Sequence, residues 1–122
     1  DIREMLCIRM MIQPLVENAI EHGLVQREGG GALRISAWTE ENDVRIEVWD
    51  DGVGFSKERL ETINAELSMG FQDAISRAGL TSFGLYNINR RMKLAYGEKY
   101  GVTIASQPGQ TQIRLRIPIR YP

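Results

Sequence analysis

The sequence predicts an α+β fold, a two-layer α/β sandwich with about three helices on one face of a mixed, mostly antiparallel sheet. Two pairs of segments alternate apolar and polar residues, and a short turn signal separates the members of each pair, as in β-hairpins. Three other segments repeat apolar residues at helical spacing. Because hairpins need no crossover helices, this order favours a sandwich over a doubly wound parallel sheet.

Composition is that of one globular domain covering residues 1–122, with 43% hydrophobic and 25% charged residues. No apolar run approaches the ~20 residues of a membrane span. The single cysteine, Cys7, and the single histidine, His22, exclude an internal disulfide and a Cys/His zinc cluster, and they favour a reducing compartment. The chain starts on Asp1 without an initiator Met, which we interpret as a piece of a longer protein.

The net charge of −1 conceals an asymmetry along the chain. Residues 1–83 contain 8 Lys and Arg against 15 Asp and Glu, whereas residues 84–122 contain 7 against 1. A basic last third suits either a nucleic acid or a polyphosphate. Because no dense run of basic residues is present, the pattern argues against a dedicated nucleic-acid binder.

The segment Gln13–Gly23 (QPLVENAIEHG) combines a helical apolar face with three polar residues suited to binding. Asn18 and His22 are four residues apart and lie on one side of the predicted helix, beside Glu17. A carboxylate, a carboxamide and an imidazole next to a buried face suit a metal ion and phosphate. Taken alone, the segment fits an ordinary amphipathic surface helix at least as well.

Local signals set the expected element boundaries. The first helix is expected to start near residues 8–11, with Pro14 in or near its first turn, and to end at Gly23. Ser56 is expected to cap the second helix and Gly97 to follow the third. The helices are expected at residues 57–67 and 83–96, and the strands at 32–39, 44–49, 102–106 and 111–119.

Two carboxylates and two glycines (Asp50-Asp51-Gly52-Val53-Gly54) follow the second predicted strand. Glycine lets the backbone turn sharply and lets a flat ligand approach. A carboxylate at such a strand end can accept a hydrogen bond from an exocyclic amine. An ordinary acidic turn remains the alternative for this motif alone.

Residues 68–83 lack clean periodicity, and a stretch of this length inside a compact domain is typical of a functional lid or of a short extra helix. Gly84 then begins a helix, so free backbone N–H groups there predict an anion site. Arg90, Arg91 and Lys93 follow on its polar side, and for at least one of them we expect only a solvated position.

Three ordered segments, ENAIEHG, DDGVGF and FGLYNINRRMKLAYG, together resemble the ATP-binding catalytic domain of two-component sensor histidine kinases. This is the Bergerat fold, which DNA gyrase B, the Hsp90 chaperones and the MutL proteins share. The likeness is closest to the LytS/YesM-type kinases and covers nearly the whole chain. Three motifs in order are far more specific than any one of them.

The resemblance implies roles for the first two motifs. Asn18 would ligate the Mg²⁺ that bridges the phosphates, and Glu17 would lie near the metal and the reacting γ-phosphate, which makes both of them catalytic residues. His22 would lie close to the phosphates. Asp50 would accept a hydrogen bond from the adenine amine. Gly52 and Gly54 complete that second motif.

The third motif implies phosphate contacts. Backbone N–H groups at Gly84 and Leu85 would meet phosphate, Arg90 would assist, and residues 68–83 would form the ATP lid. The sequence departs from the family at Asp51, where Asn is frequent, and at Ser82, where glycine is common.

The implied activity is transfer of the γ-phosphoryl group of Mg-ATP to a histidine on a separate dimerisation domain. His22 belongs to the first motif, so the acceptor is expected upstream in a parent protein. That parent would be a membrane-anchored sensor kinase with this domain in the cytoplasm and a response regulator as its partner. A gyrase-like ATPase, a non-catalytic nucleotide-binding module and an interaction domain that has lost its ligand are the alternatives.

Overall fold

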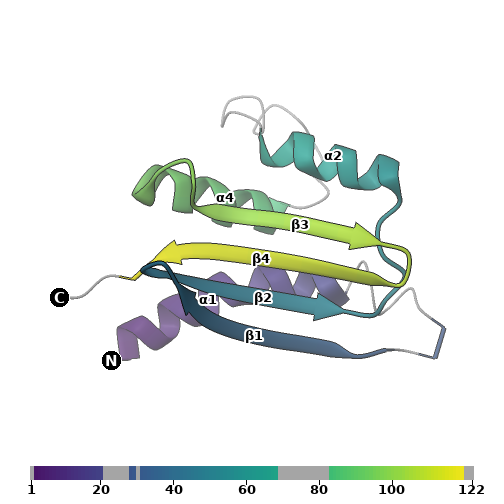
Figure 1. Ribbon diagram of the computed structural model, residues 1–122, viewed down its shortest axis with the longest axis horizontal. Helices are drawn as coiled ribbons and strands as arrows, with labels where there is room; N and C mark the ends of the chain where they lie inside the picture. Colours follow the sequence, from purple (N-terminus) through teal and green to yellow (C-terminus); the bar gives the residue numbers. More distant parts are fainter. Residues whose placement is uncertain (1, 21–27, 30, 69–82, 120–122) are drawn as a thin grey trace.

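The computed structural model describes residues 2–20, 28, 29, 31–68 and 83–119 (Figure 1). Within these residues, three helices and four strands form two layers. In chain order they are α1 (Ile2–Ala19), β1 (Leu33–Glu40), β2 (Asp43–Asp50), α2 (Lys57–Leu67), α4 (Phe83–Tyr96), β3 (Gly101–Gln107) and β4 (Gln110–Pro118). Within the described residues, no helix is long and apolar enough to cross a membrane.

The sheet has the strand order β1-β2-β4-β3, and β1 and β3 are its edges. All three pairings between the described strands are antiparallel, so the expectation of a mixed sheet is wrong for this part of the chain. The register places Asp50 opposite Leu33 on one side and Thr111 on the other. Because alternate residues face the same side, Asp50 shares a sheet face with Val48.

The core lies between the sheet and the two helices α1 and α4, which cover one face (Figure 1). Its most deeply buried side chains are Leu15, Val48, Leu85, Ile113 and Leu115. Each contributes about 1.5–3 kcal/mol of hydrophobic stabilisation. Helix α2 packs beside α4 near the β3 edge. The predicted two-layer α+β sandwich is confirmed.

Helix α1 differs from its prediction at its start. It begins at Ile2, so Pro14 lies in the helix interior and not in the first turn. Proline has no N–H, so the carbonyl of Met10 loses its usual partner one turn later. Leu15 and Ala19 are buried nevertheless, because the helix continues with its apolar side against the sheet. The predicted end at Gly23 lies outside the described residues.

The other helices match the predictions. The Ser56 hydroxyl accepts a hydrogen bond of 3.1 Å from the backbone N–H of Arg59, and α2 spans Lys57–Leu67 as expected. Helix α4 ends at Tyr96, and Gly97 follows with a φ of 116°. The strands extend one residue beyond most of their predicted ends, since backbone pairing continues past the apolar alternation.

Candidate functional site

Three predicted segments meet at one end of the molecule, where α1 and β2 end and α4 begins (Figure 1). Pro14 and Asn18 are four residues apart and therefore share a face of α1. A Cβ on Gly84 would lie 3.2 Å from the Cβ of Pro14, so this face packs closely on the start of α4. Asp50, the last residue of β2, faces the same helical layer. The fold thus brings Asn18, Asp50 and Gly84 to one region.

The side chain of Asn18 is only 6% exposed, and its Oδ1 has no hydrogen-bond partner among the described residues. Leaving a buried acceptor unpaired costs about 1–3 kcal/mol. Mg²⁺ takes oxygen ligands and usually keeps several waters besides one or two protein oxygens. The orphaned carbonyl oxygen therefore fits the magnesium ligand that the sequence predicts.

Glu17 is exposed on α1, next to Asn18. Its Oε1 accepts a hydrogen bond of 2.8 Å from Nε2 of Gln13, one turn earlier on the same helix. His22, the third polar residue of this motif, lies outside the described residues, as does Gly23.

Asp50 is 1% exposed, and its Oδ1 accepts a hydrogen bond of 2.9 Å from the backbone N–H of Gly52. Burial raises the pKa of the Asp50 carboxyl, and the neighbouring charge of Asp51 raises it further, while the Gly52 N–H partly offsets both. A buried carboxyl held by its own loop has little freedom to turn. It suits directional recognition of a ligand amine.

The glycine-rich loop after Asp50 is packed against the β3–β4 turn. Gly54 has a φ of 75°, and a Cβ there would collide with the backbone carbonyl of Gln107. The backbone N–H of Phe55 donates to the hydroxyl of Ser106 at 2.7 Å. Gly54 is therefore required by both its backbone conformation and its close approach to a neighbouring strand.

Asp51 fixes the start of β1. Its Oδ1 accepts a hydrogen bond of 2.6 Å from the backbone N–H of Ala32, and its own N–H donates to the Ala32 carbonyl at 3.2 Å. The carboxylate at this departure from the family pattern thus holds the edge strand against the loop.

Sequence reasoning missed Thr111, which lies opposite Asp50 in the sheet and is 3% exposed. Its hydroxyl is 2.9 Å from that of Ser106, and the two hydroxyls sit beside the glycine-rich loop. The sequence of β4 could have indicated this residue, because Thr111 is a polar residue on the same buried face as the apolar Ile113 and Leu115.

At the start of α4, Gly84 is exposed and Leu85 is 1% exposed in the core. Leu85 thus anchors the helix end whose N–H groups the sequence predicts to meet phosphate. Arg90 lies two turns from this end and lines a different part of the molecule, so its phosphate contact stays a prediction. The predicted lid at residues 68–83 lies almost entirely outside the described residues.

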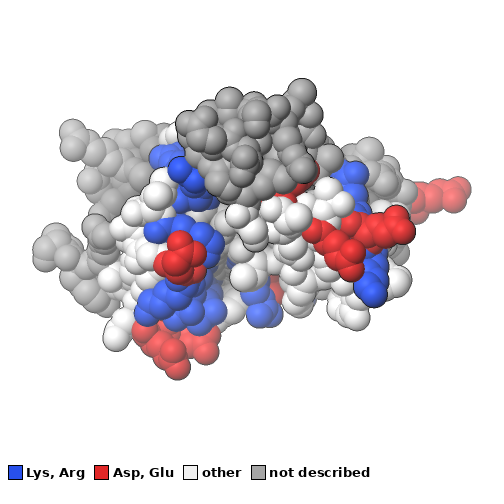
Figure 2. Space-filling view, turned by 90° about the horizontal axis from the view of Figure 1, so that it is seen from above, with Lys and Arg blue, Asp and Glu red and all other residues white. Residues whose placement is uncertain are grey.

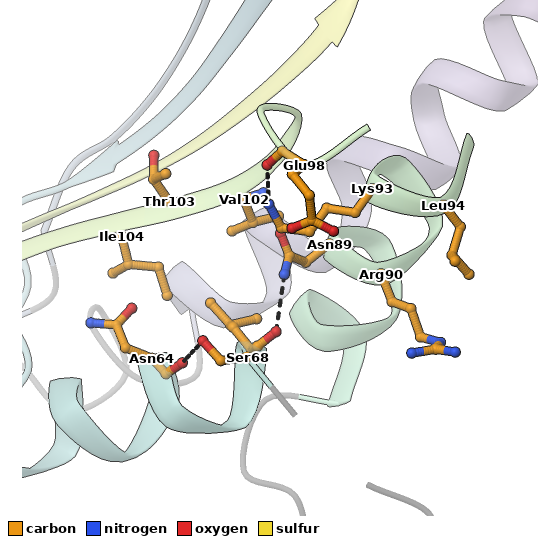
Figure 3. A pocket seen from close by; sticks show the side chains of 11 residues that line it. Asn64, Ser68, Asn89, Arg90, Lys93, Leu94, Glu98, Val102, Thr103 and Ile104 are labelled. Atoms are coloured by element: carbon orange, nitrogen blue, oxygen red, sulfur yellow. Dashed lines mark hydrogen bonds between the residues drawn. The ribbon is translucent and has the colours of Figure 1, made fainter. Parts of the chain in front are cut away.

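Arg90 lines a cavity of about 650 Å³ between α2, α4 and β3 (Figure 3). Asn18, Asp50 and Gly84 do not contribute to it. At its wall, the Asn89 side chain donates to the Leu67 carbonyl at 3.2 Å and accepts from the Val102 N–H at 2.8 Å. Asn89, on α4, is thereby bonded to α2 and β3. The cavity lies between these three elements and is separate from Asn18, Asp50 and Gly84.

Basic and acidic side chains are interleaved on the face seen from the side of α2 (Figure 2). Several cations of the basic last third lie near the end of β4, at the opposite end of β2 from Asp50. Arg116 pairs with Asp43 at 2.6 Å and Arg114 with Glu47 at 2.8 Å. These two arginines are therefore paired within the sheet, and the interpretation of the basic last third as a polyphosphate-binding surface stays a prediction.

Comparison with known proteins agrees with this arrangement. The family described as histidine kinase-, DNA gyrase B- and HSP90-like ATPases matches residues 6–121. The chain belongs to this ATPase family. It is 38% identical over 109 residues to the sensor histidine kinase YpdA of Escherichia coli, covering 89% of this chain and 17% of YpdA.

A second relative is the sensor histidine kinase YesM of Bacillus subtilis, 32% identical over 121 residues, which cover 98% of this chain and 18% of YesM. The chain thus spans less than a fifth of these two relatives. Among solved structures, the histidine kinase domain of the Escherichia coli osmosensor EnvZ has a TM-score of 0.61 at 23% identity. That match covers 96% of this chain and 66% of the EnvZ domain, and it shows the fold. This HATPase domain is therefore homologous to the catalytic domains of two-component sensor histidine kinases.

Proposed function

We propose that this HATPase domain binds Mg-ATP and donates the γ-phosphoryl group to a histidine on a separate dimerisation domain of a longer sensor kinase. The observation that carries the proposal is the buried Oδ1 of Asn18. This oxygen could coordinate a metal ion, and it has no hydrogen-bond partner among the described residues. Asn18 shares a face of α1 with Pro14, which packs on the start of α4, and the N-terminus of a helix favours an anion such as phosphate.

Each motif supplies one part of the binding function. Asn18 would hold Mg²⁺, which when bound neutralises charge on the phosphates. Asp50 would accept from the adenine amine, with Gly52 and Gly54 allowing the base to approach. The N–H groups at Gly84 and Leu85 would bind phosphate, and His22 and Arg90 are retained as further candidates for phosphate contact.

In the proposed reaction, a ring nitrogen of the acceptor histidine forms a bond to the γ-phosphorus. The bond between that phosphorus and the β–γ bridging oxygen breaks, and ADP leaves with the electron pair. The attacking nitrogen is the unprotonated one, so the proton that is lost leaves the other ring nitrogen and passes to a carboxylate or to water. Glu17 is the exposed carboxylate next to Asn18. The chain contributes mainly positioning and charge stabilisation, as is general for phosphoryl transfer.

The wider assignments belong to the same proposal. Residues 1–122 would act as one domain of a parent kinase that is anchored in a membrane and has this domain in the cytoplasm. A response regulator would receive the phosphoryl group from the parent kinase. Both partners are inferred from the likeness to sensor kinases such as YpdA and YesM.

The test is calorimetric titration of the chain with a non-hydrolysable ATP analogue, with and without Mg²⁺. We expect binding that Mg²⁺ strengthens. Asn18→Ala should remove the Mg²⁺-dependent part, and Asp50→Asn should weaken binding about tenfold or more, since a hydrogen bond to a charged group contributes about 1.5–3 kcal/mol. Glu61→Gln, at an exposed position on α2, serves as the control.

Phosphotransfer is measured separately in the full-length protein with radiolabelled ATP and acid-labile phosphohistidine as the readout. Loss of transfer by Asn18→Ala supports the metal role. Unchanged transfer by that variant, or no analogue binding by the wild-type chain at millimolar concentration, would overturn the proposal. ATP hydrolysis without phosphohistidine would instead favour a gyrase-like ATPase.

A further inference from the structure

One hydrogen bond on α1 involves a residue to which no role has been given. Nε2 of Gln13 donates to Oε1 of Glu17 at 2.8 Å, and both side chains are exposed on the same turn-to-turn stripe of the helix. Among the described residues, Gln13 is the one hydrogen-bond partner of the Glu17 side chain. Within this part of the chain, one oxygen of the carboxylate is therefore held and the other is available.

We infer that Gln13 is a positioning residue, whose carboxamide holds the Glu17 carboxylate in the orientation in which it faces the reacting phosphoryl group and the acceptor. This inference rests on the proposed function and adds a specific residue to it. Gln13 itself would not contact ATP or the acceptor histidine.

The chemistry of the donor suits this role. A lysine or arginine at position 13 would also hold the carboxylate, but its positive charge would make the carboxylate a weaker proton acceptor. A carboxamide is neutral, so it restricts the rotation of the Glu17 side chain while leaving the second oxygen able to accept a proton. Fixing a long side chain such as glutamate costs conformational entropy. A hydrogen-bond partner such as Gln13 fixes the side chain before the substrate binds, so this cost does not add to the reaction barrier.

The helix under this pair is fixed relative to the rest of the site. Leu15 and Ala19 are 0% and 2% exposed, and Pro14 packs on Gly84 at the start of α4. An orientation imposed by Gln13 on α1 is therefore an orientation relative to the proposed phosphate-binding end of α4. A pair on an unanchored surface helix would have no such consequence.

The competing explanation is that the pair only stabilises the helix, as Gln and an acidic residue four positions apart often do. Kinetics separate the two. In the full-length protein, Gln13→Ala should lower kcat for phosphohistidine formation about tenfold while leaving KM for ATP and the calorimetric affinity for the ATP analogue unchanged.

A double-mutant cycle tests whether Gln13 acts through Glu17. Glu17→Gln should lower kcat, and adding Gln13→Ala to that variant should have no further effect. Equal losses from Gln13→Ala in the wild type and in the Glu17→Gln background would overturn the inference. So would a loss of ATP-analogue affinity, because Gln13 would then act in binding.

A readout independent of activity is the side-chain amide of Gln13 in the ¹H–¹⁵N spectrum of the isolated chain, which Glu17→Ala should shift while leaving the amide of Gln112 unchanged. An unshifted Gln13 amide would show that the bond does not persist in solution and would overturn the inference. Failure of the proposed function looks different, since the wild-type protein would then neither bind the analogue nor form phosphohistidine.

Discussion

The hydroxyl of Ser106 on the edge strand β3 accepts a hydrogen bond of 2.7 Å from the backbone N–H of Phe55, which ends the glycine-rich loop after Asp50. The N–H of Gly109 approaches the carbonyl of Val53 at 3.5 Å in the same region. The loop with the proposed adenine-binding residues is therefore supported by a hairpin about fifty residues further along the chain.

Ser106→Ala should remove the hydroxyl that accepts from the Phe55 N–H and lower the free energy of unfolding by about 1–3 kcal/mol. It should also weaken ATP-analogue binding, because the loop after Asp50 loses a support. Urea unfolding and calorimetry measure the two effects. Thr103→Ala, on the exposed side of the same strand, is the control, and equal results for the two variants would contradict the role of Ser106.

Two glycines with similar backbone conformations should respond differently to alanine. Gly109 has a φ of 89° and open space around its Cβ position, whereas Gly54 has a φ of 75° and a Cβ there would meet the Gln107 carbonyl. Gly109→Ala should cost the backbone strain alone, about 1–3 kcal/mol. Gly54→Ala should cost about 2 kcal/mol more, since the loop must also move. Equal urea midpoints would show that the loop yields without cost.

The elements set by local signals could be predicted from the sequence. Ser56 caps α2, Gly97 follows α4, and the apolar alternation of β2 and β4 locates the buried face of the sheet. Asn18 and Asp50 could likewise be identified as candidate site residues from their motifs, since each motif is continuous in the chain.

Contacts between distant segments could not be predicted. Proline is most common in the first turn of a helix, and the sequence predicts Pro14 in or near that turn. In the structure Pro14 lies in the interior of α1 and packs on Gly84. The polar residues Asn89 and Ser106 join segments that only the folded chain brings together. The pairing of Arg116 with Asp43 is likewise a property of the strand order, which composition does not contain.

Asp43, at the start of β2, should make stability depend on pH. Burial raises the pKa of its carboxyl, but hydrogen bonds from Arg116 and Tyr100, with the charges of Arg116 and Lys99, outweigh burial and hold the pKa below its ordinary value. A carboxyl with a lowered folded pKa stabilises the fold above its unfolded pKa, and the contribution is lost as the pH falls through the folded pKa.

The difference in unfolding free energy between wild type and Asp43→Asn should therefore be constant between about pH 5 and pH 8 and should shrink below about pH 4. Urea unfolding across this range measures it. Glu61→Gln, at an exposed position on α2, should leave the acid limb unchanged. A difference that is the same at pH 3 and pH 7 would contradict the assignment to the Asp43 carboxyl.

Two buried asparagines on different helices should respond in opposite ways to leucine, a side chain of similar size. Asn89 is 3% exposed and fully paired, so Asn89→Leu orphans the Val102 N–H and the Leu67 carbonyl and should cost more than about 2 kcal/mol. Asn18 is 6% exposed with an unpaired Oδ1, so Asn18→Leu should leave the ligand-free chain as stable as wild type or about 1–3 kcal/mol more stable. Urea unfolding without nucleotide gives both values. This contrast is expected if Asn18 is kept for function at the expense of stability. An equal loss from both substitutions would make Asn18 a structural residue and would remove the support for its role at the metal.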